Sequence, residues 1–132
     1  MATIKTFEEL EIWKLSRQFV LKIYKLTSKP AISKDFIFRD QIRRSASSVM
    51  DNIAEGFERD SRLEFINFLS IAKGSCGEVI SQIIRGSDLE YFSLQETVEL
   101  KDGYRNLSGK IANFIQYLNQ TTIKGNKFKD RN

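Results

Sequence analysis

Histidine is absent from this chain of 132 residues, and cysteine and proline occur once each, as Cys76 and Pro30. Without histidine the chain lacks the commonest catalytic base and metal ligand, and a single cysteine cannot form an internal disulfide. No apolar run approaches the roughly 18 residues that span a bilayer, and the N-terminal residues lack a signal-peptide pattern. We therefore expect a non-enzymatic, cytoplasmic protein with no cofactor, no metal and no membrane partner.

Charge is spread unevenly along the sequence. The net charge is +4, and the chain contains 41% hydrophobic and 29% charged residues, which is typical of a globular domain. Residues 1–30 contain six Lys/Arg and three Asp/Glu, residues 31–120 contain eleven and thirteen, and residues 121–132 contain four and one. The positive excess therefore lies at the two ends. It is either an electrostatic footprint for a polyanion or a solubilising feature.

Apolar residues recur with a helical period in four stretches, and no stretch alternates as a half-buried strand does. This pattern predicts an all-α protein with helices from about 7 to 27, from 33 or 35 to about 57, from 61 to 86 and from 93 to 118. Capping signals at Thr6, Ser61 and Ser93 mark helix starts, and Pro30 ends the first helix. Short connections make neighbouring helices antiparallel, so we expect an up-down-up-down four-helix bundle over residues 1–120 and a basic, flexible tail over 121–132.

The first and third predicted helices have apolar faces wider than the roughly three-in-seven stripe that a monomeric bundle buries. The additional apolar residues are Trp13, Val20, Tyr24, Ile66, Phe68, Ile71, Ile80 and Ile84. This surplus predicts self-association, with an irregular wide core as the alternative. Cys76 lies in the apolar seam of the third helix, so we expect a buried, inert thiol.

Polar and small residues gather in the second and third predicted helices. Ser48, Asn52 and Glu55 follow one another at helical spacing, and Ser75 and Glu78 lie in the third helix. We predict that these five residues form a network between the helices, with Arg43 or Arg44 as a partner. The alternative is a ligand or RNA contact. Gly74 and Gly77 each weaken a helix by roughly 1 kcal/mol relative to alanine, and close approach of two helices would compensate.

Three segments carry a resemblance to a known family: FEELEIWKLSR at 7–17, QIRRSASSVMDNIAEG at 41–56 and SIAKGSCGE at 70–78. They resemble the small four-helix bundle proteins encoded in intervening sequences of 23S rRNA genes. The resemblance implies a ring, often a pentamer, without established enzymatic activity, and a related group of retroelement accessory proteins binds nucleic acid. The family motif maps onto Arg43, Arg44, Ser48, Asn52, Glu55, Gly74, Ser75 and Glu78. Many members have proline where this chain has Met50, so we expect a less kinked second helix.

These observations predict a homo-oligomeric bundle, for which the resemblance implies a pentamer, that binds RNA or single-stranded DNA weakly and without sequence preference. Lysine, arginine and one interleaved aromatic residue supply the predicted contacts. They are Arg43, Arg44, Lys124, Lys127, Phe128, Lys129 and Arg131. The alternative function is a protein-interaction scaffold without a nucleic-acid role.

Overall fold

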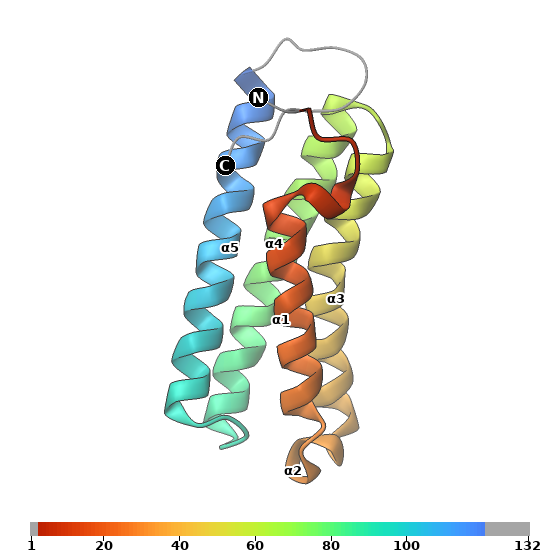
Figure 1. Cartoon of the computed structure of the whole chain (residues 1–132). Coiled ribbons are helices and arrows are strands. Elements are labelled where there is room, and N and C mark those ends of the chain that lie inside the picture. The colour runs from red at the N-terminus through yellow and green to blue at the C-terminus, as the bar shows by residue number, and fades with distance from the viewer. Residues whose placement is uncertain (1–2, 121–132) are drawn as a thin grey trace.

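The computed structural model describes residues 3–120, which form a bundle of four long helices (Figure 1). A 3-10 turn and a short helix accompany them in the described part. The elements are η1 (Phe7–Glu9), α1 (Glu11–Thr27), α2 (Pro30–Ser33), α3 (Phe36–Glu58), α4 (Arg62–Asp88) and α5 (Leu94–Gln120). Successive long helices run in opposite directions, so the predicted all-α, up-down-up-down bundle is confirmed. The tail predicted at 121–132 lies outside the described residues.

The four long helices stand at the corners of a square. α1 packs against α3 and α5, and α4 also packs against α3 and α5, so α1 and α4 occupy opposite corners. The contact between α1 and α5 is the least extensive of the four neighbouring pairs. The bundle is therefore most open between its first and last helices. None of the helices in residues 3–120 combines the length and the apolar character needed to cross a membrane.

The first long helix begins later than its capping signal predicts. Thr6 and Glu9 do form a capping box, in which the Thr6 amide donates to Glu9 Oε2 at 2.9 Å, but the box starts the turn η1. Leu10 then adopts an extended backbone and is completely buried, and α1 starts at Glu11. Burying Leu10 stabilises the fold but interrupts the helix. Pro30 is the first residue of α2, a position where its missing N–H is not needed.

The other helix starts follow their signals. The Asp35 carboxylate accepts a hydrogen bond from the Phe38 amide at 3.1 Å, and Ser61 Oγ accepts one from the Glu64 amide at 3.3 Å. The helix that was predicted to end at Gly86, α4, continues to Asp88. A Cβ atom on Gly86 would lie 2.5 Å from the Phe92 ring, so this glycine makes room for an aromatic ring and does not end the helix.

The core is apolar and contains the lone cysteine. Ile42, Val49 and Ile53 of α3 and Leu69 of α4 are all fully buried. The predicted burial of Cys76 is confirmed, and this burial raises the pKa of its thiol to about 12, which disfavours the reactive thiolate. Part of the predicted surplus apolar surface also belongs to the core. Ile80 is buried, Trp13, Val20, Ile66 and Phe68 are half-buried, and Tyr24, Ile71 and Ile84 are exposed.

Candidate nucleic-acid interface

The outer side of α1 carries exposed positive charge without acidic neighbours in sequence. No Asp or Glu occurs between Glu11 and Asp35. Ile12, Ser16 and Ile23 are buried on the inner side of the helix, so the cationic side chains point outward. We call the four exposed cations of α1, together with Lys29 just after its end, the basic face of α1: Lys14, Arg17, Lys22, Lys25 and Lys29.

Most of these charges are not neutralised within the described chain. Lys14 and Lys25 form no hydrogen bond or ion pair with another residue in 3–120, whereas Lys29 Nζ lies 3.0 Å from Glu96 Oε2. The guanidinium of Arg17 lies 5.6 Å from the centroid of the Trp13 ring. Unpaired cations on a convex helix face, with an aromatic ring beside them, suit a flexible polyanion because phosphates and bases can both be contacted.

Arg43 is part of the bundle. Its Nε donates to Thr27 Oγ1 at 2.8 Å, and Nη2 donates to Ser28 Oγ at 3.3 Å, so the side chain lies at the C-terminal end of α1. A positive charge is favourable there because it complements the helix dipole. The guanidinium also lies 4.5 Å from the centroid of the Tyr24 ring. Arg44, in contrast, is exposed and has no hydrogen bond or ion pair among the described residues.

The predicted polar network exists in a smaller form. The hydroxyls of Ser48 on α3 and Ser75 on α4 are 2.9 Å apart, and Asn52 Nδ2 donates to the Ser48 carbonyl at 2.8 Å and to Ser48 Oγ at 2.9 Å. Gln82 Nε2 donates to Ser45 Oγ at 3.0 Å farther along the same seam, an interaction that the sequence reading did not include. These bonds fix the register of α3 against α4.

Two acidic residues assigned to this network lie outside it. Glu55 is exposed and forms an ion pair with Arg59 at 3.0 Å, one turn along the same helix. Glu78 is exposed and has no partner within residues 3–120. The prediction for both was wrong because an ionised carboxylate that can reach water avoids the desolvation cost of burial.

The expectation that Gly74 and Gly77 allow close helix packing within the chain was also wrong. Both are exposed, and a Cβ atom at either position would meet no packing atom within 4 Å. Gly56 provides the close approach instead, since its Cβ would lie 2.6 Å from Phe68 Cβ. We call the solvent-facing stripe of α4 its outward face. Its uncharged exposed residues are Leu63, Asn67, Ser70, Ile71, Gly74, Gly77 and Ser81, and the exposed Glu78 lies among them one turn after Gly74.

The predicted tail contacts fall outside the described residues. They are Lys124, Lys127, Phe128, Lys129 and Arg131. Within residues 3–120, no group of three or more His, Cys, Asp or Glu is placed to hold a metal ion. The sequence analysis placed a positive excess in residues 1–30 without naming contact residues there, and the structure places this excess on the basic face of α1. The detectable signal was the acid-free run between Glu11 and Asp35, in which lysines recur at helical spacing.

The fold and this surface define a small antiparallel four-helix bundle with a cationic outer helix. Residues 8–113 match the family described as 23S rRNA-intervening sequence protein, and the chain belongs to this family, as its motifs indicated. A solved structure of a protein of unknown function from the S23 ribosomal protein family of Bacteroides thetaiotaomicron is similar, with a TM-score of 0.73 and 25% sequence identity. The similarity covers 80% of this chain and 98% of that one. No curated protein matches the sequence significantly.

Proposed function

We propose that this protein is a non-enzymatic homo-oligomer that binds RNA or single-stranded DNA through the basic face of α1. The observation that supports this proposal is the run from Lys14 to Lys29, in which four exposed cations lie on α1, Lys29 follows the end of the helix, and the intervening sequence contains no acid. Contacts of lysine and arginine with phosphates release condensed counterions, which gives affinity without reading the base sequence. Arg44 is an additional exposed contact on the adjacent helix.

A single copy presents few phosphate contacts, so its binding is weak. Several copies held together would engage one strand at several points, and each further contact would be intramolecular. The family resemblance favours a closed ring, in which head-to-tail contacts end without forming filaments. Oligomerisation therefore converts the modest charge of each chain into useful affinity.

We assign the contact between copies to the outward face of α4. Gly74 and Gly77 each destabilise a helix interior by roughly 1 kcal/mol relative to alanine, and nothing in the described chain packs against them. Leu63 and Ile71 on the same face have exposed fractions of 65% and 52%. A second helix brought close to the glycines would cover these side chains and offset the helix-propensity loss.

The positive residues at the C-terminal end extend the proposal. Lys124, Lys127, Lys129 and Arg131 would add phosphate contacts, and Phe128 would stack on a base. Deleting residues 121–132 should weaken RNA binding and flatten its dependence on salt concentration. The basic face of α1 should retain measurable binding after this deletion.

Fluorescence anisotropy with a labelled mixed-sequence RNA, titrated at several salt concentrations, tests the function. Affinity should fall steeply with salt, with a log-log slope of about −0.7 for each phosphate contacted. The double substitution Lys14→Ala and Lys25→Ala should reduce that slope, while Lys73→Ala with Lys101→Ala, an equal loss of charge on α4 and α5, should not. If micromolar protein bound no RNA at about 50 mM salt, the nucleic-acid function would be wrong and a protein-interaction scaffold would replace it.

A further inference from the structure

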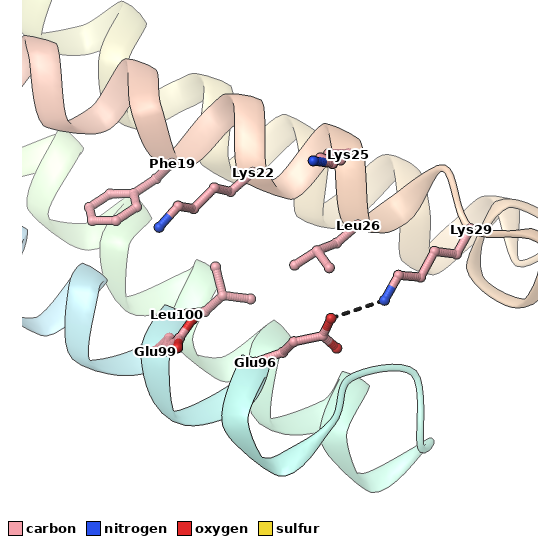
Figure 2. A pocket seen from close by; sticks show the side chains of 8 residues that line it. All are labelled: Phe19, Lys22, Lys25, Leu26, Lys29, Glu96, Glu99 and Leu100. Carbon is pink, nitrogen blue, oxygen red and sulfur yellow. Dashed lines mark hydrogen bonds and ion pairs between the residues drawn. The ribbon is translucent and has the colours of Figure 1, made fainter.

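A groove of about 360 Å³ lies between α1 and α5, on the side where the bundle is most open (Figure 2). Phe19, Leu26 and Leu100 form its apolar lining. Leu26 extends from α1 toward α5 and Leu100 from α5 toward α1 (Figure 2). The groove is continuous with the basic face because Lys22 and Lys25 belong to both.

Phe19 is held in place as one wall of this groove. Its ring lies 4.9 Å from the ring of the buried Tyr104, centroid to centroid, and it also packs on Gly103. A Cβ atom on Gly103 would come within 2.7 Å of Phe19 Cζ, so the absence of a side chain there makes room for the ring. The Lys22 ammonium lies 5.9 Å from the centroid of the Phe19 ring (Figure 2). Phe19 therefore offers a flat aromatic ligand a fixed wall, over whose ring the flexible Lys22 side chain lies.

The two glutamates on the α5 side differ in availability. Glu96 accepts the Ser93 amide through Oε1 at 2.9 Å and Lys29 through Oε2 at 3.0 Å, and these hydrogen bonds hold its pKa below the usual range. Both of its oxygens are thus engaged. Glu99 Oε1 accepts from Gln95 at 3.1 Å, whereas its Oε2 has no partner within residues 3–120. Glu99 is the carboxylate that remains available to a ligand.

We propose that this groove receives one unpaired nucleobase, preferentially guanine, from a strand whose phosphates lie on the basic face of α1. This inference rests on the proposed function. The base would stack on Phe19 and pack against Leu26, and Lys22 and Lys25 would contact the flanking phosphates. Guanine presents N1–H and N2–H side by side, so one can donate to the free Oε2 of Glu99 and the other to the second lone pair of Oε1, beside its bond from Gln95. Uracil presents a single N–H between two carbonyl groups, so it matches a carboxylate poorly.

The test measures anisotropy with two fluorescein-labelled RNA 12-mers, one of uridine alone and one with a single central guanosine. The guanosine should raise the affinity about fivefold or more, because a good bidentate contact discriminates between bases by at least that factor. Glu99→Gln should abolish the difference without weakening the binding of the uridine 12-mer. Asp102→Asn removes the same charge from an exposed position of α5 outside the groove and should preserve the guanosine preference.

The outcomes separate the two proposals. Equal affinity for both RNAs, with binding that still falls steeply with salt, would overturn the base-binding groove and leave the phosphate-binding function in place. The groove assignment would also fail if Asp102→Asn removed the preference as effectively as Glu99→Gln. If neither RNA bound, the groove and the proposed function would fail together.

Discussion

The outward faces of α1 and α4 belong to the same bundle but have opposite chemical character. Every charged side chain between Ile12 and Lys34 is positive, whereas the outward face of α4 is formed mainly by exposed uncharged residues, including Gly74 and Gly77, with Glu78 as an exposed acid among them. The two helices occupy opposite corners and do not pack against each other. One face is thus suited to remain hydrated and attract phosphates, and the other to be covered.

The difference follows from the cost of removing each kind of group from water. Ammonium and guanidinium groups are expensive to bury without partners, so the basic face of α1 is unsuitable for a dry contact between copies. Leucine and isoleucine favour removal from water, and glycine leaves a low surface that allows a second helix to approach closely. Because the proposed faces for assembly and for nucleic acid are separate, substitutions on one should leave the other unchanged.

The largest effect is expected from placing a charge on the outward face of α4. Gly74→Arg would insert a long cationic side chain between copies, so the assembly should dissociate to single chains of 15.3 kDa. Light scattering coupled to size exclusion measures the mass. Gly109→Arg is the matched control, because Gly109 is an equally open glycine on α5. If both variants kept the mass of the wild-type protein, α4 would not be the assembly face.

Glycine-to-alanine substitutions distinguish packed from outward glycines. Gly56→Ala should lower the free energy of unfolding by about 1 to 3 kcal/mol, because the added Cβ would overlap Phe68. Gly109→Ala should raise it by about 0.5 to 1 kcal/mol through helix propensity. Gly74→Ala should show less gain than Gly109→Ala in the assembled protein, since the methyl group separates the copies. Urea denaturation provides all three values, and an equal gain at 74 and 109 would argue against packing at Gly74.

The two neighbouring arginines of α3 should behave differently. Arg43→Ala should lower the free energy of unfolding by about 1 to 2 kcal/mol, because it removes the donor to the buried Thr27 hydroxyl and a positive charge at the C-terminal end of α1. Its effect on the salt dependence of RNA binding should be small. Arg44→Ala should leave stability within about 0.5 kcal/mol and reduce the salt slope. The reverse result would place Arg43 in the interface and Arg44 in the fold.

The smallest effect concerns a contact that belongs to neither face. The Tyr91 hydroxyl donates to Asp35 Oδ2 at 2.7 Å, and this bond, with the Phe38 amide, lowers the pKa of Asp35 from its ordinary 3.8. A carboxyl group whose pKa is lower in the folded protein than in the unfolded chain stabilises the fold at pH values above its unfolded pKa. This stabilisation is lost as the pH falls through the pKa of the folded state. Tyr91→Phe should therefore lose less stability than wild type between about pH 5 and pH 2. Thermal unfolding at several pH values measures this, and identical pH profiles would show that the bond is unimportant.

The fold was largely predictable from sequence, whereas the surfaces were not. Periodic isoleucine and leucine identified the buried faces, and Ser61 and Ser93 marked the helix starts, because these features act locally. The start of α1 was missed because the burial of Leu10 is a tertiary effect that overrides the capping box at Thr6. Glu78 lies close in sequence to the polar residues between α3 and α4. Its residue type alone does not tell whether its side chain faces the bundle or the solvent. The α1–α5 groove depends on the unequal packing of distant helices, which no sequence pattern records.

Photocrosslinking to RNA that contains 4-thiouridine, followed by peptide mapping, tests the division between α1 and α4 most directly. The rings nearest the proposed strand are Trp13, Phe19 and Tyr24, so crosslinked peptides should come from residues 12–34. The outward face of α4 should remain unmodified, and high salt should abolish the crosslinks because phosphate contacts bring the strand to α1. Crosslinks within residues 63–81, or crosslinks confined to residues 121–132, would contradict the account.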